Sequence, residues 1–167
     1  IWDSRSDKLM MVRDRLGIKP LYYYKTVDGV LFGSEPKSIL ANPLANKTVT
    51  LCGLRELFAF GIKPQTNTFW ENMHEIEPGT IVTVTRAGLQ SIRYWTLETQ
   101  PQTDGKDATI ANIRELLDDI VYLQLLVNES PCFLLSGGLD SSVITAIAAK
   151  YLSLSGKHVR SFAVDFI

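Results

Sequence analysis

The sequence predicts an α+β region followed by an α/β region. Up to about residue 99, apolar and polar residues alternate with a period of two within short segments, and turn residues separate these segments. After residue 107 the period changes to 3.6, and helices then alternate with strands. A polar, turn-rich segment that begins Gln100-Pro101-Gln102 separates the two patterns. We therefore expect domains at 1–99 and 108–167, with a linker at 100–107.

The first region contains strand candidates joined by tight turns. They are Leu9–Val12, Leu21–Tyr24, Val30–Gly33, Ile81–Thr85 and Ser91–Trp95. Asp28-Gly29 is a hairpin signal, and Arg86-Ala87-Gly88 is the tip of a second hairpin. The pattern predicts antiparallel sheets, with the three consecutive tyrosines at 22–24 on a strand of the sheet sandwich.

Two short helices interrupt these strands. The first spans 34–40, with Ser34 as its expected N-cap and Pro36 in its first turn. The second spans Cys52 to Phe60 and is expected to stop at Gly61.

The second region has the order of a βαβ unit preceded by a helix. Apolar residues from Ile110 to Val121 share one face of a predicted helix over 108–126. Asn128–Pro131 is expected to end that helix. The apolar run 132–135 predicts a strand buried on both faces, and a helix follows from about Asp140 to Leu154. Gly156 lies beyond that helix, and the final strand is expected at 159–166. This order implies a parallel sheet.

Composition excludes several classes of protein. The 167 residues are 46% hydrophobic and 21% charged, as in an ordinary globular protein. A net charge of −1 gives no general attraction to nucleic acid, and no apolar run approaches the ~20 residues of a membrane span. Two cysteines are too few for a disulfide framework, so we expect a cytoplasmic protein in which Cys52 and Cys132 are small core residues. His74 and His158 are isolated and lack metal-ligand spacing.

Both ends of the sequence fall inside apolar strands. Ile1-Trp2-Asp3 reads as the close of a strand, and the last residues are again strand-like. We therefore expect an internal piece of a longer protein.

The loop between the buried strand and its helix carries the clearest chemistry. It reads Leu135-Ser136-Gly137-Gly138-Leu139-Asp140-Ser141-Ser142. Adjacent glycines let backbone N–H groups turn inward, and serine hydroxyls at a helix start add donors for an anion such as phosphate. The loop lacks the lysine of a Walker motif, so Asp140 is expected to hold Mg²⁺, directly or through water. The alternative is a structural Gly-Gly turn in which Asp140 caps the helix.

Ser136–Ser142 resembles the SGGxDSS pyrophosphate loop of the N-type ATP pyrophosphatases, and with its flanks it is similar to the glutamine-hydrolysing asparagine synthetases. A second stretch, Val12–Tyr23 followed by Leu31–Ile39, resembles the later half of the glutaminase domain of that family. Glu75–Thr80 and Tyr94-Trp95 also match the segment before the family's linker. The resemblance covers nearly the whole chain.

The resemblance implies a fold and a reaction. Residues 1–99 would be the C-terminal part of an Ntn-hydrolase αββα sandwich, a class II amidotransferase, and 108–167 the start of a parallel-sheet ATP-pyrophosphatase domain. Aspartate would be activated by ATP as β-aspartyl-AMP and amidated with ammonia from glutamine. The residues implied to bind ATP or pyrophosphate are Leu135, Ser136, Gly137, Gly138, Leu139, Asp140, Ser141, Ser142 and Val164. Aspartate, glutamine and ATP are the implied partners, Mg²⁺ is the cofactor, and a homodimer stays open.

No glutaminase catalytic residue is assigned here, because the family's N-terminal cysteine nucleophile has no counterpart at Ile1. Arg13, Asp14 and Arg15 are interpreted as an ion-pair and turn element. The family often has glycine where this chain has Asp165, which leaves the acceptor open. One alternative is therefore a β-lactam synthetase-like or other amide-forming ligase with a different acceptor. A separate alternative is an inactive truncated module that binds nucleotide or serves in interactions.

Overall fold

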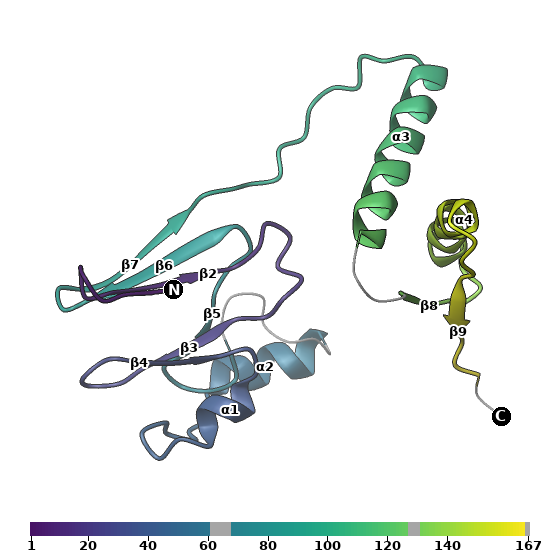
Figure 1. Cartoon of the computed structure of the whole chain (residues 1–167). Helices are drawn as coiled ribbons and strands as arrows, with labels where there is room; N and C mark the ends of the chain where they lie inside the picture. The colour runs from purple at the N-terminus through teal and green to yellow at the C-terminus, as the bar shows by residue number, and fades with distance from the viewer. Residues whose placement is uncertain (61–67, 127–130, 166–167) are drawn as a thin grey trace. The chain divides into compact units, whose positions relative to one another are not determined.

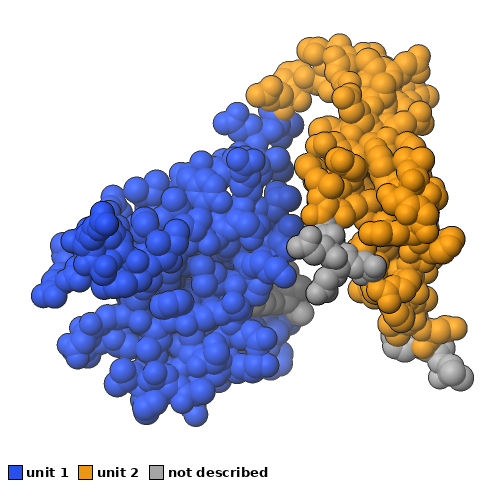
Figure 2. Space-filling view, viewed as in Figure 1, with its two compact units in different colours: residues 1–99 blue, residues 100–167 orange. Residues whose placement is uncertain are grey.

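The computed structural model describes residues 1–60, 68–126 and 131–165. The chain divides into two compact units, Ile1–Thr99 and Gln100–Ile167, which are blue and orange in Figure 2. None of the helices in the described ranges is long and apolar enough to cross a membrane.

The first unit is built on two antiparallel sheets. Its strands are β1 (Trp2–Asp3), β2 (Lys8–Val12), β3 (Tyr22–Lys25), β4 (Val30–Gly33), β5 (Met73–Glu75), β6 (Thr80–Thr85) and β7 (Gly88–Arg93). One sheet has the order β1-β2-β6-β7 and the other the order β4-β3-β5. The two predicted hairpins are present, since β3 pairs with β4 and β6 pairs with β7, both antiparallel.

Two apolar clusters hold this unit together. Met11, Ile76 and Val82 are buried in a cluster against which Leu21 and Tyr23 pack, so it joins the two sheets. Tyr22 and Tyr24 point to the opposite side of β3, because side chains alternate along a strand, and they form a second cluster with residues of the following helix and loop. Figure 1 shows the result as layers: the β2-β6-β7 sheet, then β3 and β4, then helices. The tyrosines therefore lie in the sandwich, as predicted.

The helices of the first unit are α1 (Pro36–Leu40) and α2 (Leu51–Phe60). The predicted N-cap at Ser34 is wrong. Glu35 is the N-cap, with extended φ and ψ of −133° and 138°, because a residue before proline is pushed out of the helical region. The predicted stop at Gly61 lies outside the described residues.

β5 is the strand that the sequence pattern missed. Its centre, His74, has a half-buried side chain between the buried Met73 and Glu75. The buried carboxylate of Glu75 breaks the apolar alternation that is typical of a strand. Arg13, which forms an ion pair with Glu75, is far away in the sequence.

The second unit contains α3 (Lys106–Leu125), β8 (Cys132–Leu134), α4 (Leu139–Leu154) and β9 (Arg160–Phe162). β8 and β9 pair in parallel, so the predicted βαβ unit is present. Gly156 has a φ of +67° and ends α4 as expected. The predicted 159–166 strand is too long, since β9 ends at Phe162. Its predicted last residue and the predicted helix breaker at 128–130 lie outside the described residues.

Two burial predictions are wrong. β8 is not buried on both faces, since Leu134 is 79% exposed. Among the described strands, β8 pairs with β9 alone. Cys52 and Cys132 are exposed free thiols rather than core residues.

Candidate functional site: a glycine-serine loop at the start of α4

The candidate site is the loop that joins β8 to α4. Its first residue is tied to the neighbouring strand, because Leu135 N donates to Phe162 O at 2.8 Å. The carboxyl ends of β8 and β9 therefore meet at one edge of the parallel pair, where α/β proteins bind ligands.

Gly137 and Gly138 give the loop its backbone path. Gly137 has a φ of +80°, a conformation that residues with a Cβ rarely adopt, and open space surrounds the position of an added Cβ. Gly138 is the N-cap of α4 with an extended ψ of 162° and no side-chain cap. The first hydrogen bond within the helix runs from Ser142 N to Gly138 O at 3.1 Å. Backbone N–H groups just before Ser142 have no acceptor within the helix, so they are available to a ligand.

Two serines of the loop share one carbonyl, and the third serine contacts one of them. Ser142 Oγ donates to Gly138 O at 2.7 Å, and Ser141 Oγ donates to the same oxygen at 3.2 Å. Ser136 Oγ lies 3.1 Å from Ser141 Oγ. The structure thus brings together the hydroxyls that the sequence predicted to act together.

Asp140 is exposed in the first turn of α4, inside the helix. It is not the N-cap, which contradicts the purely structural alternative for this residue. The described residues contain no cluster of three His, Cys, Asp or Glu side chains that could hold a metal ion. Asp140 fits a Mg²⁺ that is also bound by phosphate, because this ion commonly takes one or two carboxylates and completes its shell with phosphate oxygens and water.

The apolar members of the predicted site lie at its margins. Leu135 is half-buried directly after β8, whereas Leu139 is 80% exposed at the start of α4. Val164, two residues beyond β9, is 78% exposed. Leu135 and Val164 follow paired strands and are therefore at the same edge of the sheet.

The second motif of the sequence forms a separate, structural centre in the first unit. Arg13 is buried at the end of β2, and its Nη1 lies 3.0 Å from Glu75 Oε1. The same guanidinium donates to Ile76 O, and Nη2 donates to Gly17 O at 3.0 Å. Because Arg13 follows a strand of one sheet and Glu75 belongs to the other, the pair links the sheets. The sequence predicted the ion pair but not Glu75 as its acid.

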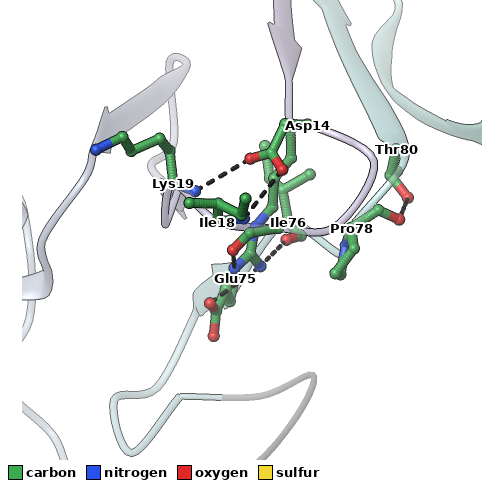
Figure 3. A network of polar contacts seen from close by, with 9 residues as sticks. Asp14, Ile18, Lys19, Glu75, Ile76, Pro78 and Thr80 are labelled. Atoms are coloured by element: carbon green, nitrogen blue, oxygen red, sulfur yellow. Dashed lines mark hydrogen bonds and ion pairs between the residues drawn. The ribbon is translucent and has the colours of Figure 1, made fainter. Parts of the chain in front are cut away.

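Asp14 folds the loop that follows, as Figure 3 shows. Its two carboxylate oxygens accept hydrogen bonds from the backbone N–H groups of Ile18 and Lys19, each at 3.0 Å. These bonds lower the pKa of Asp14 from its ordinary value of 3.8. Gly79 N donates to Asp14 O at 2.9 Å, which fixes the loop to the β5–β6 connection. Arg13 and Asp14 therefore have the structural roles predicted for them, while Arg15 is exposed.

Comparison with known families divides the chain in two. A family model described as "Glutamine amidotransferase domain" matches residues 1–95. A second model, described as "Asparagine synthase", matches residues 112–167, a range that includes the whole β8–α4 loop.

Individual relatives extend over nearly all of the chain. It is 42% identical to asparagine synthetase [glutamine-hydrolyzing] 3 of Bacillus subtilis over 99% of its length, and 29% identical over 99% to a putative asparagine synthetase [glutamine-hydrolyzing] 2 of Methanocaldococcus jannaschii. A 28% identical relative in Gibberella zeae, matched over 94% of the chain, is named amidase chry2. The chain spans 27%, 33% and 24% of these three relatives.

Among solved structures, a glutamine phosphoribosylpyrophosphate amidotransferase from B. subtilis covers 92% of this chain and 30% of its own, at 16% identity and a TM-score of 0.32. The first family model covers more than half of the chain, so the chain belongs to the glutamine amidotransferase family, and over 99% of its length it is similar to a glutamine-hydrolysing asparagine synthetase.

Proposed function

We propose that this chain is part of an enzyme that converts aspartate to asparagine with ATP, through β-aspartyl-AMP, using ammonia from the hydrolysis of glutamine. Glutamate, AMP and pyrophosphate are the other products. The observation that carries this proposal is the loop after β8, whose glycines and clustered hydroxyls lie at the start of α4 inside the segment matched by the asparagine synthase model.

The loop residues have distinct roles in this proposal. The hydroxyls of Ser136, Ser141 and Ser142 and the backbone from Gly137 onward bind the outer two phosphates of ATP and then the released pyrophosphate. The N-terminal end of α4 favours negative charge there. Leu135 and Val164 border the adenosine, and Leu139 is the first residue of α4, next to Asp140.

Asp140 is proposed to hold Mg²⁺ beside these phosphates. That ion supplies charge neutralisation as the bond between the α- and β-phosphates breaks. Fixed donors of the loop stabilise the same developing charge without having to reorganise.

The domain assignment follows from the same reasoning. We propose that 1–99 is the later part of an Ntn-hydrolase amidotransferase domain, 100–107 a linker and 108–167 the first part of an ATP-pyrophosphatase domain. The described residues of the first unit supply two sheet layers and one helical layer of the expected αββα arrangement. No residue of this chain is assigned to glutamine hydrolysis. A cytoplasmic location and a homodimer belong to the proposal as well.

A second candidate is the same activation chemistry on a different acceptor. It is favoured by the relatives named amidase, of which chry2 matches 94% of this chain. The loop binds only the nucleotide end of the reaction, so its geometry is common to both candidates.

The experiment is isotope exchange between pyrophosphate and ATP, measured on the complete protein that the gene encodes, with and without aspartate. We expect exchange that depends on aspartate and Mg²⁺. Asp140→Asn should reduce it about 100-fold or more, by analogy with the loss of one electrostatic group from an active site.

The matched control is Asp107→Asn, which removes an exposed acid from the first turn of α3 instead. It should leave exchange unchanged. Exchange that requires another carboxylic acid would favour the second candidate. Equal exchange by wild type and Asp140→Asn would refute the role of Asp140, and no exchange with any acceptor would support the inactive module.

A further inference from the structure

A row of hydroxyl contacts continues from the candidate loop into the body of α4. Ser136 Oγ contacts Ser141 Oγ at 3.1 Å, and Ser141 Oγ donates to Gly138 O at 3.2 Å. The carbonyl of Ser141 in turn accepts a hydrogen bond from Thr145 Oγ1 at 2.7 Å. Ser141 is therefore bound at both ends, by its hydroxyl to the loop and by its carbonyl to Thr145.

The Ser141 hydroxyl lies between two polar groups of the loop. It is within hydrogen-bond distance of both Ser136 Oγ and Gly138 O, and its single proton is available to one partner at a time, either of these groups or a bound anion. The rotamer of Ser141 therefore decides which group its hydroxyl meets.

Thr145 is placed to fix that orientation. It is half-buried and, with Ser141, lines a cavity of about 470 Å³ between α3, β8 and α4. Partial burial reduces competition from water, so its short bond to Ser141 O is held more firmly than the same bond on an exposed helix face. The hydroxyl adds a second donor to a carbonyl that already belongs to the helical ladder.

The chain offers a comparison for this kind of bond. Ser153 Oγ donates to Lys150 O at 2.8 Å, also from a side chain to a carbonyl of the preceding turn of α4. That bond is exposed and lies at the opposite end of the helix from the loop. It stabilises the helix without touching any residue of the candidate site.

We propose that Thr145 is a positioning residue for the phosphate-binding loop, acting through the Ser141 carbonyl to aim the Ser141 hydroxyl. This inference rests on the proposed function, because the loop must bind pyrophosphate for its orientation to matter. Thr145 itself does not contact the phosphates.

The test is calorimetric titration of the gene-encoded protein with magnesium pyrophosphate, together with the KM for ATP in the exchange reaction. Thr145→Val keeps the shape but removes the hydroxyl, and we expect about tenfold weaker pyrophosphate binding, the lower end of what loss of an outer-shell partner costs. Thr145→Ser keeps the hydroxyl and should restore binding to within about twofold of wild type. Ser153→Ala should bind pyrophosphate as wild type does.

A double-mutant cycle separates positioning from a general effect on the helix. In a Ser141→Ala background, Thr145→Val should add no further loss of pyrophosphate affinity, because its route to the phosphates is already gone. Additive losses would overturn the proposal, as would equal binding by Thr145→Val and wild type, or failure of Thr145→Ser to restore binding. Thr145→Ala replaces the valine variant if thermal unfolding shows that the latter does not fold. Failure of the proposed function is a different result, in which wild type neither binds pyrophosphate nor exchanges it.

Discussion

At the scale of single residues, Gly137 and Gly138 are adjacent but serve the loop differently. Gly137 needs a positive φ of +80°, whereas Gly138 has an ordinary φ of −72°. A Cβ on Gly137 would meet no atom within 4 Å, and one on Gly138 would meet only Ser136 Oγ at 3.5 Å. Sterics are therefore equal at the two positions, and only the backbone conformation distinguishes them.

This difference predicts effects of different size for two alanine variants. Gly137→Ala should lower the free energy of unfolding of the second unit by about 1–2 kcal/mol, the cost of a left-handed L-residue. Gly138→Ala should change it by no more than about 0.5 kcal/mol. Hydrogen exchange of the α4 amides measures both. Equal effects of the two variants would show that the loop does not depend on the φ of Gly137.

Asp14 gives a prediction about pH. Its pKa is lowered in the folded chain, chiefly by the backbone hydrogen bonds of Lys19 and then Ile18, so the ionised form stabilises the fold. That contribution is present above the ordinary value of 3.8 and is lost as the pH falls below it through the folded pKa. Asp14→Asn should therefore flatten the decrease in stability with falling pH in this acid range, as measured by urea unfolding at several pH values. An unchanged pH profile would contradict the assigned role.

At the scale of elements, the sheets of the first unit are joined by apolar contacts and by one buried ion pair. The side chains of Arg13 and Glu75 are 9% and 5% exposed, while those of Arg86 and Asp7, 2.9 Å apart, are 90% and 49% exposed. Burial is what makes an ion pair costly to break, because water cannot replace the missing partner.

Two matched substitutions test that contrast. Arg13→Met should lower the free energy of unfolding by about 3–5 kcal/mol, since Glu75 would keep a buried carboxylate and two carbonyls would lose their donor. Arg86→Met, which removes the exposed pair, should lower it by less than about 1 kcal/mol. Fluorescence reports the unfolding of this unit because all three tryptophans, at positions 2, 70 and 95, lie within it. Similar losses from both variants would mean that the buried pair has no special part in joining the sheets.

The elements also show which features sequence patterns can predict. Hairpin turns and helical periodicity are local, so β3–β4, β6–β7 and the helix–strand order of the second unit were predicted within a few residues. β5 was missed because its burial depends on Glu75 meeting Arg13, which lies 62 positions earlier in the chain. The N-cap of α1 was misplaced by one residue because the constraint of Pro36 outweighed the cap preference of Ser34.

The candidate site was more predictable than the packing around it. Its residues are consecutive, so the sequence placed Ser136–Ser142 together without knowledge of the fold. The sequence did not predict a role for Thr145, because that role depends on its side-chain rotamer and on a hydrogen bond to one carbonyl, and neither has a sequence pattern. Exposure of Leu134 could not be predicted from its apolar neighbours, because burial depends on how many strands accompany β8.

At the scale of the whole molecule, the chain combines two structural classes in two compact units. The antiparallel sandwich of the first unit matches the amidotransferase model, and the parallel βαβ unit of the second matches the asparagine synthase model. The proposed phosphate chemistry belongs entirely to the second unit, where the loop, α4 and the end of β9 are neighbours in one fold.

Everything proposed for the second unit depends on the loop after β8 binding the outer phosphates of a nucleotide. The most direct test is an amide NMR titration of the gene-encoded protein with magnesium pyrophosphate. We expect saturable chemical-shift changes concentrated at Ser136–Ser142, and we expect Asp140→Asn to weaken them. Chemical-shift changes at other amides but not at these, or no saturable change at any amide, would contradict phosphate binding by this loop.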